Sequence, residues 1–229
     1  MDFSVFEKRI GIPFRDKNLL RTAFTHRSYL NENRKSGMEH NERLEFLGDA
    51  VLELIVTEYL FAKYPDRNEG DLTSYRSALV NAVTLAGVAE KLGMNDFLLL
   101  SRGENKDTGR ARQVILANAI EAFLGALYLD GGYEVTKHFV STHIFKLIDD
   151  IVHKKMWLDA KSHFQERAQE IVGITPSYST VSAEGPDHDK KFTVAVFLGK
   201  EKIAEGDGKS KQEAEQQAAK LGLQAKGWE

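Results

Sequence analysis

Residues 40–49 read HNERLEFLGD, and the apolar residues from this stretch onward recur every three or four positions, as in a helix with one buried face. At about 100° per residue, Glu42, Glu45 and Asp49 fall within an arc of roughly 60° that lies off the apolar face. Like charges at these spacings cost an isolated helix roughly 0.2–0.5 kcal/mol each, and Arg43 points elsewhere. A partner outside the helix is therefore expected to offset the three charges.

A second acidic position lies in residues 115–132, which read ILANAIEAFLGALYLDGG. Glu121 stands there without a charged neighbour in an apolar, alanine-rich helix, and Asn118 lies one turn before it. A lone carboxylate on a core helix usually has a charged partner or a metal. Glu69 and Asp71, in the loop PDRNEGD before the next helix, could close the same pocket.

Clustered oxygen ligands without cysteine or a nearby histidine suit a hard cation, and Mg²⁺ fits best because it takes a few carboxylates and keeps water or phosphate oxygens. Such a site favours phosphate-ester chemistry. Two other interpretations stay open. The stripe could be a solvated acidic face, and a di-iron bundle is the rival metal site, although it needs Glu-x-x-His pairs that the sequence lacks.

Composition sets broad limits on the 229-residue chain. Hydrophobic residues make up 42% and charged residues 28%, which is a globular profile, and the net charge of -3 neither demands nor excludes a polyanionic partner. The absence of cysteine excludes disulfides, thiolate zinc sites and a thiol nucleophile, and it fits a reducing compartment. The first residues lack the apolar core of a signal peptide, and we expect no later apolar run of membrane-spanning length. A cytoplasmic protein without membrane contact is expected.

The periodicity of the sequence changes near residue 151. Residues 1–151 are expected to form an all-helical domain, residues 152–158 a linker, and residues 159–229 a small α+β domain. The second domain is expected to contain a helix, three strands and a helix, over residues 160–172, 177–183, 192–198, 202–205 and 210–223. The last helix opens with SKQE, a capping box.

The start of that last helix carries Lys209, Ser210 and Lys211. Backbone N–H groups and the helix dipole favour an anion there, so the two lysines could clamp a phosphate. Ordinary solvation of a helix start is the alternative, because basic and acidic residues balance in this domain. Three separated polar contacts are what reading an A-form RNA duplex by shape requires. The other expected contacts, on the first helix and in the turn GPDHDK, are Gln165, Glu166 and His188.

These motifs together resemble ribonuclease III, the bacterial-type enzyme that cuts double-stranded RNA. HNERLEFLGDAVLE is similar to the family signature, and THRSY, NEGDLTSYRSALV and GR-x-x-x-x-ILA-x-x-x-EA occur around it in the expected order. GPDH and GDGKSKQEAEQQAA resemble the double-stranded-RNA-binding domain of the same family. The resemblance covers nearly the whole chain.

The resemblance implies a metal-dependent endoribonuclease that works as a homodimer, without a small-molecule cofactor. It implies Mg²⁺, with Mn²⁺ as a possible substitute, cleavage to 5′-phosphate and 3′-hydroxyl ends, and precursors of ribosomal RNA among the substrates. A two-fold symmetric enzyme suits two antiparallel strands. The residues carried over by position are Glu45, Asp49 and Glu121 as metal ligands, Asp49 and Glu121 as catalytic, Glu42 and Glu69 at a second metal or its waters, and Phe46 as a subunit contact.

Asn118 departs from the family pattern, which usually has Asp at this position. An amide oxygen can coordinate Mg²⁺, but each missing charge weakens attraction to a divalent ion by an amount on the order of a few kcal/mol. A duplex-RNA-binding protein of the same fold, with weak or no cleavage, is therefore the alternative function.

Overall fold

The computed structural model describes residues 1–106, 108–153, 159–186 and 190–228. The chain divides into two compact units, with the division inside residues 154–158, and each unit is described by itself. Among its described residues the first unit is helical, apart from an isolated parallel bridge between Thr25 and Leu99. This agrees with the helical domain expected from the sequence.

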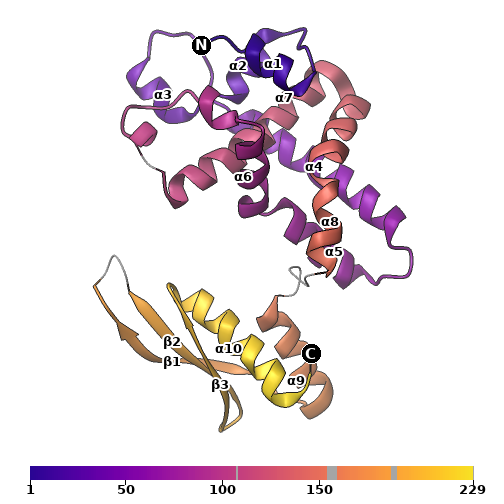
Figure 1. Ribbon diagram of the computed structural model, residues 1–229, viewed down its shortest axis with the longest axis vertical. Helices are drawn as coiled ribbons and strands as arrows, with labels where there is room; N and C mark the ends of the chain where they lie inside the picture. The colour runs from indigo at the N-terminus through magenta and orange to yellow at the C-terminus, as the bar shows by residue number, and fades with distance from the viewer. Residues whose placement is uncertain (107, 154–158, 187–189, 229) are drawn as a thin grey trace. The chain divides into compact units, whose positions relative to one another are not determined.

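The first unit is built around two long helices, with shorter helices packed around them (Figure 1). Side-chain caps begin four of the shorter helices, where Asp16, His26, Asn68 and Asn81 accept a backbone N–H from the first turn. The elements are α1 (Ser4–Ile10), α2 (Lys17–Ala23), α3 (Arg27–Glu32), α4 (Glu42–Lys63), α5 (Glu69–Val80), α6 (Ala82–Lys91), η1 (Met94–Phe97), η2 (Glu104–Lys106), α7 (Arg110–His143), η3 (Phe145–Leu147) and α8 (Ile148–His153).

The two long helices, α4 and α7, touch at backbone distance. A Cβ added to Gly48 of α4 would lie 1.7 Å from the carbonyl oxygen of Glu121, and one added to Gly125 of α7 would lie 2.2 Å from the carbonyl oxygen of Leu44. Only glycine at both positions permits this approach. Fully buried side chains of both helices form part of the core of this unit, among them Leu52, Ile55, Ile120, Phe123 and Leu124.

The start of α4 is tied to the segment before α3. The Asn41 N–H donates to the carbonyl of Thr25 at 2.9 Å, and the Asn41 side chain, 3% exposed, donates to the carbonyl of Ala23. On its other side the same segment pairs with the chain around Leu99, which accepts from the His26 N–H at 3.0 Å. The segment 25–26 is therefore held on two sides, and it anchors the residue directly before Glu42.

Helix α7 is interrupted at Gly132, where φ is 80°. The stretch Arg110–His153 is long and apolar enough to cross a membrane by length and composition, so the expectation that no apolar run reaches that length is wrong. Within the fold, 61% of its most apolar window is buried, which is the burial of a core helix.

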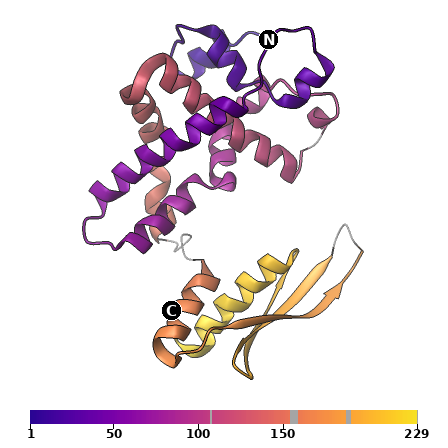
Figure 2. The ribbon, with the colours of Figure 1, turned by 180° about the vertical axis from the view of Figure 1, so that it is seen from behind.

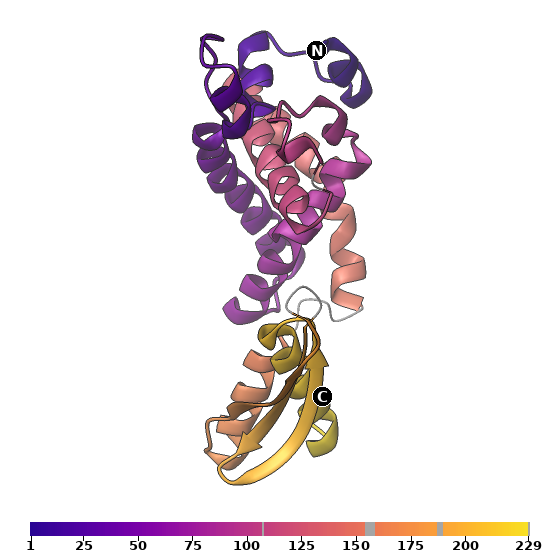
Figure 3. The ribbon, with the colours of Figure 1, turned by 90° about the vertical axis from the view of Figure 1, so that its left-hand side faces the viewer.

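The second unit comprises α9 (Ala160–Val172), β1 (Ser177–Glu184), β2 (Lys191–Leu198), β3 (Glu201–Gly208) and α10 (Lys211–Lys226). The sheet is antiparallel in the order β1-β2-β3, with Val194 opposite Thr180 and Gly206. Both helices lie against one face of the sheet (Figure 3). Val194, Val196 and Leu198 of β2 point into the core on that face, as the alternation predicts. The predicted order of a helix, three strands and a helix is confirmed.

The linker was predicted at residues 152–158, and the first two of these residues belong to a helix. Val152 and His153 are the last residues of α8, and Ile151, 4% exposed, anchors that helix in the core of the first unit. Residues 154–158 lie outside the described part of the chain. The exact position of the linker therefore stays a prediction.

Candidate active site

Three carboxylates lie along the first two turns of α4: Glu42 and Asp49 are exposed and Glu45 is half-buried. Because the helix begins at Glu42, two of the acids lie in its first turn, where the helix dipole favours negative charge. The cost expected from the like charges is correspondingly smaller. The dipole weakens beyond the first turn, so it leaves Asp49 to be offset by something else.

Helix α7 meets these acids with Asn118 and Glu121. Since Gly48 touches the backbone of Glu121, the residues on either side of Gly48, Glu45 and Asp49, lie beside the second helix. The Asn118 side chain hydrogen-bonds the Glu45 carboxylate, and the amide is the donor because an ionised carboxylate only accepts. The structure therefore brings together four of the residues expected at the site. Their role as ligands stays a prediction.

The electrostatics of this acidic cluster, Glu45, Asp49, Asn118 and Glu121, show uncompensated negative charge. Burial, followed by the nearby charges of Asp49 and Glu45, raises the pKa of Glu121 to about 7. Burial and then the charge of Glu42 raise the pKa of Glu45, while the hydrogen bond from Asn118 opposes that shift. Glu121 is thus partly protonated at neutral pH, and a cation would displace that proton.

The donor atoms of the cluster fit Mg²⁺, because three carboxylates and an amide supply hard oxygen ligands without sulfur or imidazole. Burial, followed by the charges of Asp49 and Glu45, raises the pKa of Glu121, and no basic side chain lowers it. In the described part of the chain, however, no three acidic or histidine side chains already converge as a metal cage.

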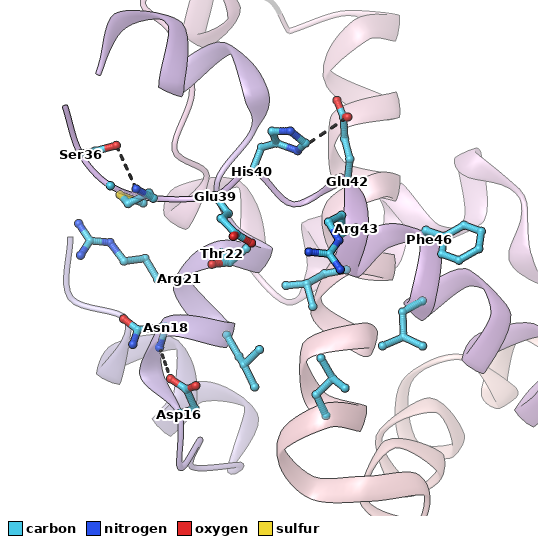
Figure 4. A pocket seen from close by; sticks show the side chains of 16 residues that line it. Asp16, Asn18, Arg21, Thr22, Ser36, Glu39, His40, Glu42, Arg43 and Phe46 are labelled. Atoms are coloured by element: carbon cyan, nitrogen blue, oxygen red, sulfur yellow. Dashed lines mark hydrogen bonds and ion pairs between the residues drawn. The ribbon is translucent and has the colours of Figure 1, made fainter. Parts of the chain in front are cut away.

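Glu42 lies at the rim of the cluster, between two basic side chains. Its Oε1 is 3.4 Å from Nη1 of Arg27, and its Oε2 is 3.7 Å from Nδ1 of His40. Figure 4 shows the His40 contact at the edge of a hollow of about 1040 Å³ between α2, the chain before α4, and α4 itself. Sequence analysis missed Arg27, although THRSY was recognised as part of the family pattern. His26 in that motif is structural, since its Nδ1 lies 2.8 Å from Oγ of Ser28 at the start of α3.

Glu69 and Asp71 do not close this pocket in their own chain. They lie in the first turn of α5, which follows the far end of α4 (Figure 2), and the 22 residues of α4 span about 33 Å from the end that carries Glu45. Glu69 accepts a hydrogen bond from Oγ1 of Thr73, and Asp71 pairs with Arg67 at 3.7 Å. The sequence placed these acids near the cluster because the length of α4 was not taken into account.

Phe46 is 82% exposed on α4, directly beside Glu45. A residue this large and apolar is rarely left in water without a partner. Toward the other end of α4, Phe61 is 74% exposed and lines a hollow of about 410 Å³ together with Leu60, Leu72 and Glu69. Helix α4 thus carries an exposed aromatic side chain, Phe46, near its start and an apolar hollow beside Phe61 toward its end.

In the second unit, Lys209 and Lys211 are exposed at the start of α10, and neither has an ion-pair partner among the described residues. Ser210 caps the helix by accepting the Glu213 N–H at 3.2 Å, and the Glu213 carboxylate accepts the Lys209 N–H at 2.8 Å. The predicted cap by Ser210 is confirmed, and the Glu213 carboxylate returns to the N–H one residue before the cap. It presents both ammonium groups to solvent at the positive end of a helix.

The first helix of the second unit, α9, presents a polar, exposed face. Gln165 and Glu166 lie on it and line a shallow hollow of about 670 Å³ with Ser162, Gln169 and Glu170. His188, the third expected contact, lies outside the described residues.

Comparison with known proteins agrees with this arrangement. Residues 16–148 match the family model described as Ribonuclease-III-like, and residues 160–226 match the double-stranded RNA binding motif. The ribonuclease 3 of Desulforamulus reducens is 46% identical over 216 residues, which cover 94% of this chain and 88% of that protein. The ribonuclease 3 of Bacillus velezensis is 44% identical over 221 residues, covering 96% of this chain and 88% of that protein.

A solved structure is also similar. The nuclease domain of ribonuclease III from Campylobacter jejuni, described as flexible in a region involved in dimer formation, is 43% identical with a TM-score of 0.58. The match covers 63% of this chain and 97% of that domain. These similarities agree with the order of the two units and with the motifs on α4 and α7. The chain therefore belongs to the ribonuclease III family of endoribonucleases.

Proposed function

We propose that the chain, a double-stranded-RNA endoribonuclease by its family, cuts at the acidic cluster of α4 and α7. The observation that carries this proposal is the backbone contact at Gly48, which sets Glu45 and Asp49 beside Glu121. None of these three carboxylates has an ion-pair partner among the described residues. Cleavage leaves 5′-phosphate and 3′-hydroxyl ends, and precursors of ribosomal RNA, in the cytoplasm, are the substrates that the family indicates.

Mg²⁺, with Mn²⁺ as a substitute, is the proposed cofactor. Glu45, Asp49 and Glu121 would hold it through carboxylate oxygens, and Asn118 through the amide oxygen that its hydrogen bond to Glu45 leaves free. When bound, the metal activates water and neutralises the leaving oxygen of the phosphodiester. Asn118 meanwhile orients Glu45, and Glu121 releases its proton as the site fills.

The neutral amide at Asn118 supports a second candidate. One ligand charge fewer weakens metal binding, and a protein of this fold that binds duplex RNA but cuts slowly would result. Cleavage is favoured over this alternative because Asp49 and Glu121 are both present and charge-coupled. The metal dependence of cleavage separates the two.

A homodimer would complete the site. If Phe46 of one copy enters the apolar hollow beside Phe61 of the other, two-fold symmetry repeats the contact and both exposed rings are buried. The hollow is also lined by Glu69, so the same docking brings the partner's Glu69 next to Glu45. Phe46→Glu should give monomers in sedimentation experiments, whereas Val83→Glu, at another exposed apolar position on α6, should leave the dimer intact.

The second unit is proposed to bind the RNA duplex. Lys209 and Lys211 would contact phosphates, with Ser210 between them, and Gln165 and Glu166 of α9 would contact minor-groove hydroxyls. His188 remains a proposed third contact. These groups read the shape of A-form RNA and not its sequence.

The test of the proposal uses the full chain and three substrates of equal length: duplex RNA, duplex DNA and single-stranded RNA. With Mg²⁺, only duplex RNA should be cut, and mapping should show 5′-phosphate and 3′-hydroxyl ends. A chelator should stop cleavage without releasing the RNA. Binding without cleavage at any Mg²⁺ concentration would favour the second candidate, and cleavage of DNA would contradict both.

A further inference from the structure

The carboxylate of Glu42 has a nitrogen-bearing side chain beside each of its two oxygens. Arg27 lies 3.4 Å from Oε1 and His40 lies 3.7 Å from Oε2. Nδ1 of His40 is buried and has no hydrogen-bond partner, so its polar contact is with this carboxylate (Figure 4). In contrast, the acids deeper in the cluster have no basic neighbour of this kind among the described residues.

The contact between Arg27 and Glu42 is built into the backbone. Arg27 is the first residue of α3, two positions after Thr25, whose carbonyl accepts the N–H of Asn41 at 2.9 Å. Asn41 immediately precedes Glu42. The residue before Arg27, His26, is fixed to the carbonyl of Leu99. Both members of the ion pair are therefore presented by segments that are hydrogen-bonded to each other, unlike a chance pair of long surface side chains.

Stability does not explain this arrangement. The side chain of Arg27 is 70% exposed and that of Glu42 is 46% exposed, and a pair this open contributes little to folding. The Arg27–Glu42 pair must therefore act on the position and the charge of the Glu42 carboxylate. The charge of Glu42 acts on its neighbour Glu45, so Glu42 is electrically part of the cluster although it stands at the rim.

We propose that Arg27 is a positioning residue for RNA cleavage: it orients the Glu42 carboxylate, beside His40, at the rim of the acidic cluster and balances its charge. This inference rests on the proposed function of the cluster. It has two opposite consequences. Without the guanidinium, the cluster attracts a divalent ion more strongly, because one positive charge is gone. At the same time Glu42 loses its fixed orientation, and a misplaced group lowers the rate of the chemical step.

The test compares Arg27→Gln, Arg27→Lys and a matched control, Arg21→Gln. Arg21 is an exposed guanidinium that lines the same hollow as Glu42 but lies across it (Figure 4). The first readout is binding of Mg²⁺ alone, followed by the rise in melting temperature without RNA. For Arg27→Gln the half-effect concentration should fall by about two- to fivefold, as one screened charge at this range allows. Arg27→Lys and Arg21→Gln should match the wild type.

The second readout is single-turnover cleavage of duplex RNA at saturating Mg²⁺. Arg27→Gln should be slower by about tenfold, the scale of a misplaced group, with partial rescue by Arg27→Lys and no change for Arg21→Gln. If Arg27 acts through Glu42, the double variant Arg27→Gln/Glu42→Gln should cut no more slowly than Glu42→Gln.

Three results would overturn the inference. These are a wild-type rate and metal dependence for Arg27→Gln, an equal effect of Arg21→Gln, or a further loss when Arg27→Gln is added to Glu42→Gln. The failure of the proposed function is distinguishable, because it would appear as normal cleavage by Glu121→Ala. If Glu121→Ala does not cut RNA and Arg27→Gln behaves as the wild type, the proposed active site stands and only the inference about Arg27 is refuted.

Discussion

Glu121→Gln should stabilise the metal-free protein, and only at neutral and alkaline pH. Burial and the charges of Asp49 and Glu45 raise the pKa of Glu121 from the ordinary 4.5 to about 7 in the folded state. The folded protein therefore binds a proton between these pH values that the unfolded chain has released. Stability falls as pH rises through this window, because the unfolded state binds fewer protons.

The size of the effect follows from the shift. A shift from 4.5 to about 7 corresponds to at most about 3.4 kcal/mol of unfolding free energy, at about 1.4 kcal/mol per unit. Glu121 is only half-buried, so solvent screening reduces this to about 1–2 kcal/mol. In a protein of this size that is about 2–8 °C in melting temperature. The neutral Gln side chain avoids the penalty.

The assay is calorimetric melting in chelator at pH 5 and pH 8. Glu121→Gln should melt near the wild type at pH 5 and about 2–8 °C above it at pH 8. Saturating Mg²⁺ should favour the wild type instead, since only the carboxylate gains a cation. Glu134→Gln, an exposed change on the same helix, should show no pH-dependent difference. If the melting temperatures of the Glu121 variant and the wild type differ by the same amount at both pH values, Glu121 is not charge-coupled to Asp49 and Glu45 as described above.

Other variants test the remaining parts of the account. Asn118→Asp should lower the Mg²⁺ concentration for half-maximal cleavage and lower the melting temperature in chelator, because it adds a ligand charge and removes the hydrogen bond to Glu45; an unchanged Mg²⁺ titration would contradict its place in the site. Gly48→Ala should destabilise the first unit by about 3 kcal/mol or more, because its Cβ would lie 1.7 Å from a carbonyl oxygen, whereas Gly87→Ala on α6 meets nothing within 4 Å and should be tolerated. Replacing Lys209 and Lys211 with Ala should weaken duplex-RNA binding and flatten its salt dependence by about two phosphate contacts; equal slopes would refute the clamp.

Local patterns predicted most of the fold. The alternation through Phe192, Val194, Val196 and Leu198 fixed the middle strand and its buried face. The SKQE box placed the start of the last helix at the correct residue. Such signals succeed because capping and strand alternation depend on residues only a few positions apart.

The pairing of α4 with α7 was predicted from chemistry and not from packing. Uncompensated acids on two helices suggested that the helices meet, and Gly48 and Gly125 are the physical reason that they can. Glu69 was expected near Glu45 of its own chain, but most of a long helix, α4, separates the two, and the role of Glu69 at a metal stays a prediction. Arg27 was overlooked because its partner, Glu42, lies fifteen positions away and is reached only through a turn of the chain.

The most direct test of the central claim is cleavage of a long RNA duplex by Glu121→Ala beside the wild type, with duplex binding measured on the same samples. The wild type should cut in Mg²⁺. The variant should bind the duplex with the same affinity and melt no lower than the wild type in chelator, yet leave the RNA intact, because it loses a ligand for the ion at the scissile phosphate. Cleavage at the wild-type rate, or loss of folding together with activity, would contradict the assignment of this cluster as the active site.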